Sequence, residues 1–259
     1  MNHKRSQLVA TSGTPTQCVS CAVRERALFQ GIPPEQLKWT QTYRENQYRI
    51  EARSQLFEEG EDHPFAYTLY SGWMMLTKSS TGGRRQVLRF ALPGDFIGFQ
   101  ANLSGNMSYG AYALTDCRLC AFPRARLSSM MKETPELAAR MAMLNARDMS
   151  FMEQVLLATG QKNARERLTS LLLQLYVRVQ SLGNLVPETD ENSIRFPISQ
   201  EKMGEALGMT AEHVNRSLRE LREEGVLEVK SRRLKILNLN RALEIAEIDM
   251  QTIEQQALL

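Results

Sequence analysis

The sequence has few cysteines, little net charge and no long apolar run, and each shortage excludes a class of protein. Four cysteines in 259 residues are too few for a secreted scaffold held together by disulfides. No apolar run approaches the roughly 18 to 20 residues that a membrane-spanning helix requires, so we expect no membrane partner. Because no apolar segment follows the polar N-terminal residues, we also expect no signal peptide and a cytoplasmic location. The net charge of only +3 excludes a polycation that binds nucleic acid through its global charge.

The four cysteines form two C-x-x-C pairs, Cys18 with Cys21 and Cys117 with Cys120. A thiol oxidoreductase would place the first cysteine of a pair at a helix N-terminus beside a βαβ unit. Neither pair has that setting, so we do not expect an enzyme.

Residues 55–123 have the pattern of an all-β unit. Short apolar stretches recur at intervals of roughly 8 to 12 residues and alternate with Gly-bearing turns, as in a sandwich or a rolled barrel. The expected strands are 66–69, 73–77, 86–90, 109–114 and 118–122.

A long helix is expected from Pro135 to about residue 157, with Thr134 as its N-cap and Gly160 at its end. Its first apolar stripe would cover the β-unit and consists of Leu137, Met141, Leu144, Phe151 and Val155. A second, uncharged stripe is spaced alternately by four and three residues, and it consists of Ala138, Ala142, Asn145, Met149, Met152 and Leu156. This spacing favours a coiled-coil seam between two copies of the chain, whose register a lone Asn would fix. The alternative is a helix buried between two parts of one subunit.

A second helix is expected at 164–180, followed by a polar connection at 181–193. Between residues 196 and 238 the pattern is helix, Gly-bearing turn, helix and hairpin. Ser199 is expected to cap the first of these helices and Thr210 the second, which spans 211–224, while 226–230 and 234–237 form the hairpin. This order is typical of a winged helix-turn-helix domain.

The N-terminal end of the second helix carries the side chains expected to read bases in the major groove, namely Glu212, His213, Asn215 and Arg216. Further basic side chains would contact phosphates, and these are Arg219, Arg222, Lys230, Arg232, Arg233 and Lys235. Ser199 and Thr210, at the two helix starts, are also counted among the expected DNA contacts. The alternative is a solvated charged helix, since Glu220, Glu223 and Glu224 alternate with the arginines.

Several of these segments resemble the Crp/Fnr transcription regulators. The similar segments are Leu-Pro-Gly-Asp-Phe-Ile-Gly at 92–98, Asn-Ala-Arg-Glu-Arg-Leu at 163–168, Ser-Gln-Glu at 199–201 and Glu-His-Val-Asn-Arg at 212–216. The resemblance implies an α+β fold with a cyclic-nucleotide-binding-like β-roll, a long dimerisation helix and a C-terminal winged helix-turn-helix. The expected division is a flexible N-terminal segment at 1–22, the β-roll at 23–133, the dimerisation helix at 134–160 and the DNA-binding domain at 161–259.

Within that family, residues 213–216 are most similar to the FixK-like and Fnr-like regulators of oxygen, nitrogen or redox metabolism. Such regulators bind palindromic double-stranded DNA as homodimers and recruit RNA polymerase, so the resemblance implies the same partners here. Glu212 and Arg216 match the positions of the family's base-reading Glu and Arg.

The cysteines also resemble the Fnr pattern, because Cys18 and Cys21 look like its N-terminal cluster motif and Cys120 matches its distant internal ligand. Ala27 stands where Fnr has a third N-terminal cysteine, which leaves Cys117 as the substitute. Cys117 and Cys120 would face opposite sides of a regular strand, so both can ligate only if residues 115–117 form a turn or bulge. On that condition, a 4Fe-4S cluster held by Cys18, Cys21, Cys117 and Cys120 would make the regulator responsive to oxygen or redox state.

Other signals remain as alternatives. The four thiols can instead hold zinc or act as a thiol–disulfide switch, or the regulator can be constitutive with no cofactor. Cyclic nucleotide is not expected, because residues 98–100 and 106–111 offer no arginine for a cyclic phosphate. Haem is not expected either, because His213 belongs to the reading helix and His63 to a polar turn.

Overall fold

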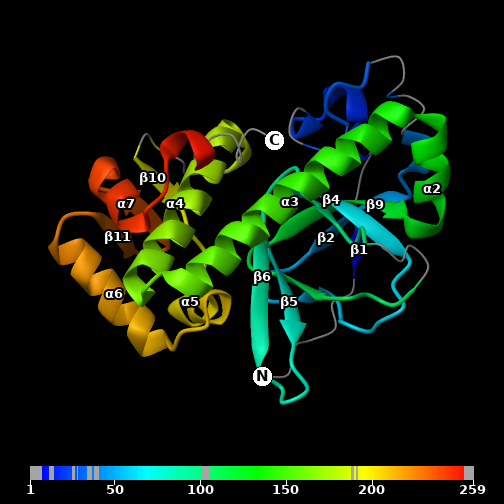
Figure 1. Ribbon diagram of the computed structural model, residues 1–259. Helices are drawn as coiled ribbons and strands as arrows, with labels where there is room; N and C mark the ends of the chain where they lie inside the picture. Colours follow the sequence, from blue (N-terminus) through cyan, green and yellow to red (C-terminus); the bar gives the residue numbers. More distant parts are fainter. Residues whose placement is uncertain are drawn as a thin grey trace. The chain divides into compact units, whose positions relative to one another are not determined.

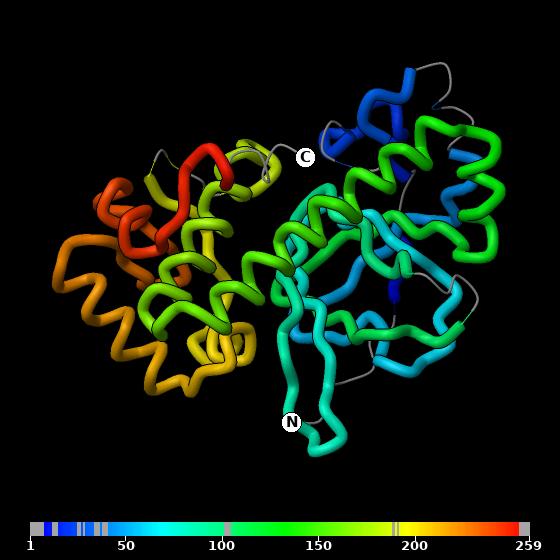
Figure 2. The backbone as a smooth tube through the Cα atoms, viewed as in Figure 1, coloured from blue at the N-terminus to red at the C-terminus, as the bar shows by residue number. Residues whose placement is uncertain are grey.

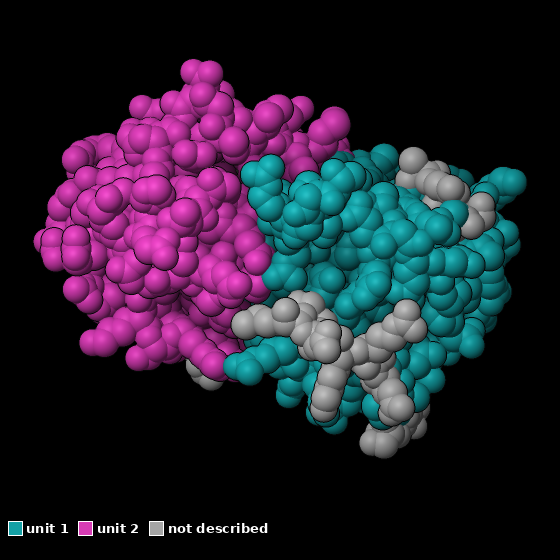
Figure 3. Space-filling model, turned by 90° about the horizontal axis from the view of Figure 1, so that it is seen from below, with its two compact units in different colours: residues 1–145 teal, residues 146–259 magenta. Residues whose placement is uncertain are grey.

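The computed structural model describes residues 8–11, 15–24, 27, 29–33, 37, 41–100, 105–187, 190 and 192–253. The chain divides into two compact units, residues 1–145 and residues 146–259 (Figure 3). This division falls inside the long helix α3 (Pro135–Gln161), which contributes its first part to unit 1 and its second part to unit 2. The sequence predicted this helix as a separate segment at 134–160. It also placed the end of the helix at Gly160, one residue before the observed end.

Two antiparallel sheets form the β-roll of unit 1 (Figure 1). The first has the order β1 (Val9–Ala10), β2 (Asn46–Ile50), β9 (Cys117–Pro123), β4 (Phe65–Ser71) and β7 (Phe96–Ile97). The second has the order β3 (Gln55–Phe57), β8 (Gly110–Ala113), β5 (Met74–Ser79) and β6 (Arg85–Ala91). All five predicted strands are present, as β4, β5, β6, β8 and β9.

Side chains alternate between two cores along β4 and β9, because successive residues of a strand point to opposite faces. The inner core fills the roll and includes Tyr67 and Leu69 of β4 and Cys117, Leu119 and Ala121 of β9. The outer core lies on the other face of the same sheet, where helix α2 (Arg124–Glu133), the first part of α3 and the N-terminal segment contribute side chains. Its buried members are Cys18, Phe29, Ile32, Leu37, Tyr43, Ala66, Phe96, Cys120, Phe122, Leu127, Met130, Leu137, Met141 and Leu144.

The N-terminal segment differs from the flexible stretch expected at 1–22, of which residues 1–7 and 12–14 lie outside the described part. Val9 and Ala10 pair with Arg49 and Tyr48 of β2, and the Thr11 amide donates to the Gln47 carbonyl at 2.9 Å. Figure 2 draws the described parts of this segment in dark blue. Its polar composition concealed the attachment, because backbone hydrogen bonds to a sheet edge need no apolar side chain.

Unit 2 is built on helix α4 (Ala164–Leu182), which contacts helices α5 (Gln200–Leu207), α6 (Ala211–Glu223) and α7 (Leu239–Ala246). Asn163 opens α4 with a capping box in which its side chain accepts from the Glu166 amide. A short 3-10 helix (Gly183–Leu185) follows α4. A three-stranded sheet has the order β10 (Ser193–Arg195), β12 (Arg233–Ile236) and β11 (Leu227–Lys230).

The predicted fold class is confirmed, while the strands β1, β2, β3, β7 and β10 and the helices α2 and α7 were not predicted. Among the described residues, no helix combines the length and the apolar character that crossing a membrane requires.

Candidate cofactor pocket and nucleic-acid interface

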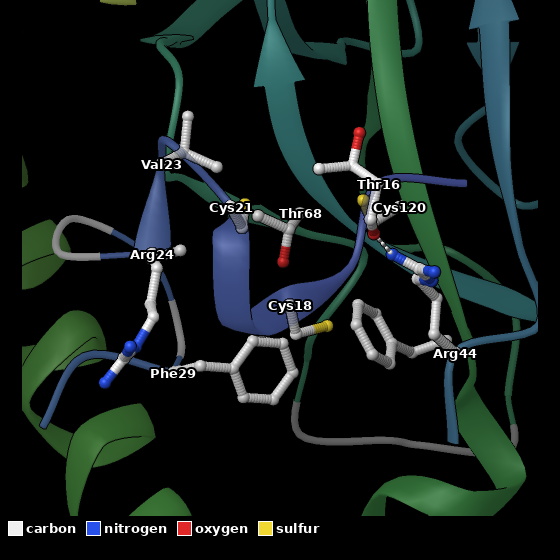
Figure 4. Close-up of a pocket in the computed structure, with 11 residues that line it drawn as sticks. Thr16, Cys18, Cys21, Val23, Arg24, Phe29, Arg44, Thr68 and Cys120 are labelled. Carbon is white, nitrogen blue, oxygen red and sulfur yellow. Dashed lines mark hydrogen bonds between the residues drawn. The ribbon is translucent and has the colours of Figure 1, made fainter. Parts of the chain in front are cut away.

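Three of the four cysteines line one pocket between the N-terminal segment and the five-stranded sheet (Figure 4). Cys18 and Cys21 come from the N-terminal segment and Cys120 from β9, and Ala27 and Thr68 line the same pocket. The remaining lining residues are Thr16, Val23, Arg24, Phe29, Arg44 and Phe122.

Cys18 begins a short 3-10 helix (Cys18–Ser20), and Cys21 follows it directly as the C-cap residue. The Cys21 amide donates to the Cys18 carbonyl at 3.4 Å, and Cys18 is buried in the outer core. The C-x-x-C spacing thus places the two cysteines at the two ends of one turn, and both line the pocket.

Cys120 is fixed by two neighbouring strands. The register pairs it with Gln47 of β2 and with Thr68 of β4. The buried Gln47 amide donates from Nε2 to the Cys120 Sγ at 3.6 Å. Strand pairing on both sides therefore sets where this thiol lies.

Burial controls the charge of these thiols. Desolvation raises the pKa of Cys120 to about 11 and also raises the pKa of Cys21, while the Arg44 guanidinium opposes both shifts. Arg44 is itself anchored, since its Nη1 donates to the Thr16 carbonyl. Because the thiolate is the nucleophile, neutral thiols of this kind are slow to oxidise, which argues against a switch made of free thiols.

Two polar side-chain atoms of pocket-lining residues have no hydrogen-bond partner among the described residues, Arg24 Nε and the hydroxyl oxygen of Thr68, and of these only the hydroxyl oxygen has a lone pair to offer a metal. The Thr68 side chain is only 3% exposed. An unpaired buried hydroxyl costs about 1 to 3 kcal/mol, so its presence needs a reason. Figure 4 shows this oxygen lying among the thiols of Cys18, Cys21 and Cys120.

Cys117 does not join the other three cysteines. Strand β9 begins at Cys117, and its register with β2 is unbroken from the Ile50–Cys117 pair to the Asn46–Ala121 pair. The turn between β8 and β9 ends at Asp116, so Cys117 already belongs to the regular strand, and its side chain lies in the inner core. Its Sγ donates to the carbonyls of Thr115 at 3.2 Å and Trp73 at 3.4 Å. We correct its assignment from ligand to core residue.

The three pocket thiols line a common space without converging on a point. Within the described ranges, no group of three or more His, Cys, Asp or Glu side chains is arranged to hold a single metal ion. A zinc ion needs all its sulfur ligands at about 2.3 Å from one centre.

The helix-turn-helix in unit 2 is fixed by two side-chain caps. Ser199 Oγ accepts from the Lys202 amide and Thr210 Oγ1 from the His213 amide, each at 3.3 Å. Gly208, with φ of +65°, ends α5 in the left-handed conformation that favours glycine. A Cβ at Gly204 would lie 2.5 Å from the Met209 carbonyl oxygen, so the turn approaches α5 where only glycine fits.

The recognition helix, α6, buries Val214, Leu218 and Leu221 and exposes its polar face. The exposed residues include Glu212, His213, Asn215, Arg216 and Arg219. A hydrogen bond from its own backbone N–H, and a second from the Thr210 side chain, lower the pKa of Glu212, which therefore presents a carboxylate. The Asn215 amide donates to Gln200 Oε1 at 3.1 Å, which orients it from α5.

The wing, β11 with β12, is joined by a two-residue turn in which Ser231 and Arg232 have φ of +50° and +59°. Positive φ at both central residues matches the twist of a tight hairpin. Arg232 is exposed at this tip, whereas Arg233 forms an ion pair with Asp190 and donates to Ser193 Oγ. Of the two wing arginines expected to bind DNA, Arg232 is thus the more available.

Helix α3 presents its two stripes as different surfaces. Leu137, Met141, Leu144 and Phe151 of the first stripe are buried. In the second stripe Ala138 is half-buried, and the exposed members are Ala142, Asn145, Met149, Met152 and Leu156. Met149 is 62% and Leu156 74% exposed, which is unusual for large apolar side chains in a row.

Sequence reasoning missed Thr68, Gln47 and Arg44 as neighbours of the cysteines. No sequence signal marks them, because their role depends on which strands pair with β9 and on which face they lie.

Comparison with known proteins adds two family matches. Residues 48–134 match the cyclic nucleotide-binding domain and residues 166–243 the Crp-like helix-turn-helix domain. The chain is 28% identical to the transcriptional activator protein FnrL of Cereibacter sphaeroides, over 90% of this chain and 93% of that protein. It is 27% identical to the nitrogen fixation regulation protein FixK of Bradyrhizobium diazoefficiens, over 82% of this chain and 86% of that protein.

A more distant similarity is to the fumarate and nitrate reduction regulatory protein of Vibrio cholerae, at 23% identity over 94% of this chain and 96% of that protein. Among solved structures, FixK2 from Bradyrhizobium japonicum has the same fold, with a TM-score of 0.70 at 23% identity, covering 79% of this chain and 98% of that chain. These relatives are regulators of transcription, not enzymes.

Proposed function

This chain belongs to the Crp/Fnr family of transcription regulators, and from that membership we propose a homodimer whose DNA binding depends on an iron–sulfur cluster held by Cys18, Cys21 and Cys120. The observation that carries it is the pocket that gathers these three cysteines from separate parts of unit 1.

For DNA, the exposed side chains at the start of α6 read base edges in the major groove. Arg216 can donate two hydrogen bonds to one guanine, and the ionised Glu212 can accept from cytosine. Arg219 and Arg232 contact phosphates, which position the unit without reading sequence. Ser199 and Thr210 cap the two helices and lie exposed beside this face, where they can also contact the backbone.

For the dimer, the second stripe of α3 forms a coiled-coil seam with the same stripe of a second copy. A heptad pattern of exposed apolar residues on a long helix supports this part. Two α6 helices would then meet the two halves of a palindromic site, one DNA turn apart. Recruitment of RNA polymerase is part of the same proposal, with the turn at 81–85 as a contact.

For the cofactor, the donor set fits a cluster better than it fits zinc. Thiolates on a cluster bind separate iron atoms and need not converge on one centre, which agrees with three thiols that line a pocket without surrounding a point. When bound, such a cluster supplies an electron-transfer centre that oxygen can oxidise. Cyclic nucleotide has no part in this proposal. Both polar atoms of the Gln100 side chain are already hydrogen-bonded, since Nε2 donates to the Asn106 carbonyl and Oε1 accepts from the Ser108 amide.

The outer core offers a route from the pocket to the dimer seam. Cys18 and Cys120 belong to it together with Leu137, Met141 and Leu144 of α3. On the same turns of α3, Ala142 and Asn145 face outward in the seam. A change in how the cysteine segment is held therefore reaches the helix that carries the dimer contacts through packed side chains.

The test is anaerobic purification of the wild-type chain and of Cys18→Ala, followed by visible spectra and by iron and sulfide analysis. We expect a brown wild type with iron and sulfide and a colourless variant. A colourless wild type without metal would favour the alternative, a regulator that needs no cofactor, and zinc in place of iron would favour a zinc-controlled one.

A further inference from the structure

We infer that the cofactor pocket provides three sulfur donors and one oxygen donor, and that the oxygen donor is the hydroxyl of Thr68. This inference rests on the proposed function, because it names a fourth group for the same cofactor. Cys18, Cys21 and Cys120 are the sulfur donors, and Thr68 lines the same pocket.

A fourth sulfur donor is absent from the described lining of the pocket. Ala27, which is buried there, has no donor atom in its side chain. Cys117 lies in the inner core, on the opposite face of β9 from Cys120. A cofactor with four protein donors must therefore take its fourth from a group other than cysteine.

The Thr68 hydroxyl is suited to that position by its place and by its lack of other bonds. Thr68 lies directly opposite Cys120 in the register of β4 with β9, which fixes its backbone beside that thiol. Its oxygen has no partner among the described residues, although the side chain is 97% buried. The two arginines of the pocket have no lone pair to offer a metal, and they donate to the carbonyls of Ile32 and Thr16.

If the hydroxyl served only to stabilise the fold, its removal would lower the stability of the metal-free protein. A hydroxyl without a hydrogen-bond partner predicts the opposite. Valine has the shape of threonine without its hydroxyl, so a Thr68→Val chain fills the same space and removes an unpaired polar atom. The metal-free variant should therefore be at least as stable as the metal-free wild type. A hydroxyl that costs stability in the empty protein is retained for a ligand.

The experiment compares Thr68→Val, Thr68→Ser and Thr77→Val in the full chain with the wild type. Thr77 is a matched control, because it is equally buried but lies on β5 of the other sheet. Each chain is loaded anaerobically with iron and sulfide and then exposed to an iron chelator, and iron release and the electron paramagnetic resonance spectrum are recorded. Urea unfolding of each metal-free chain is measured in parallel.

We expect Thr68→Val to release iron about tenfold faster and to change the resonance spectrum, since loss of a supporting group weakens metal sites by this order. Its metal-free form should unfold at the same urea concentration as the wild type or a higher one. Thr68→Ser and Thr77→Val should retain iron like the wild type. Unchanged iron release by Thr68→Val would overturn the inference while leaving the proposed function intact. A metal-free Thr68→Val that is clearly less stable would assign Thr68 a structural role and also overturn it. A wild type that takes up no iron or sulfide would overturn both.

Discussion

Thr68 and Cys120 lie directly opposite each other on the neighbouring strands β4 and β9, and both side chains line the cysteine pocket. Cys117, three residues before Cys120, belongs to the inner core on the other face of the sheet. The division of the two cysteines of one C-x-x-C pair between two cores is the basis of the predictions that follow.

Replacement of Cys117 and of Cys120 should have different effects. Cys120→Ala removes a donor and should abolish retention of iron and sulfide. Cys117→Ala should retain both and lower the free energy of unfolding by about 1 kcal/mol, because it leaves a small cavity in the inner core. Iron and sulfide analysis with urea unfolding checks this. If Cys117→Ala also lost its iron, the three-cysteine site would be disproved.

Ala27→Cys should strengthen the site. Ala27 is buried and lines the pocket, so a thiol there adds a fourth sulfur donor beside the other three. We expect the visible absorbance of the anaerobically prepared variant to decay several-fold more slowly in air. Ala91→Cys is the control, because Ala91 is equally buried but lies in the inner core. If the visible absorbance of both variants decayed at the same rate, a thiol at position 27 would not act as a fourth donor, and the prediction would be wrong.

A charge in the exposed stripe of α3 should prevent dimer formation. Met152→Glu places two carboxylates in an apolar seam, where their desolvation is costly. Sedimentation velocity should show a monomer for this variant and a dimer for the wild type. Glu153→Gln, at the neighbouring exposed position, should remain dimeric. A dimeric Met152→Glu would place the seam elsewhere on the chain.

Arg216 and Arg232 should affect DNA binding in distinguishable ways. Arg216→Ala should cost about 1 to 3 kcal/mol and relax the base preference at one position of each half-site. Arg232→Ala should weaken binding to all sequences alike and lower the slope of log affinity against log salt by about one for each subunit. Titrations of selected and scrambled duplexes at several salt concentrations separate the two. The same loss on both duplexes for Arg216→Ala would remove it from base reading.

Local patterns predicted much of the fold. The strands β4, β5, β6, β8 and β9 and the helix-turn-helix carry alternating apolar residues, capping side chains and turn glycines, and all of these signals lie within a few residues of each other. Helix α2 was missed because it follows β9 without a break and has only Leu127 and Met130 as buried apolar side chains. Helix α7 and strand β10 are short, and their contacts with α4 and β12 decide their structure.

The site was predicted in part. The grouping of Cys18, Cys21 and Cys120 followed from resemblance, and the doubt about Cys117 followed from the two-residue period of a strand. Whether Cys117 joins the other three cysteines depends on the register of β9 with β2, which the sequence alone does not determine. Thr68 escaped notice because a threonine in a strand is ordinary, and only its burial without a partner distinguishes it.

The most direct test of the central claim is the affinity of the anaerobically prepared wild type for a DNA site selected from a random pool, measured before and after exposure to air. Cys18→Ala is measured alongside under both conditions. The account predicts that air weakens binding by the wild type at least about tenfold, a coupling of about 1.4 kcal/mol, while the variant binds weakly throughout. Equal affinity of the wild type with and without air, matched by Cys18→Ala, would contradict it.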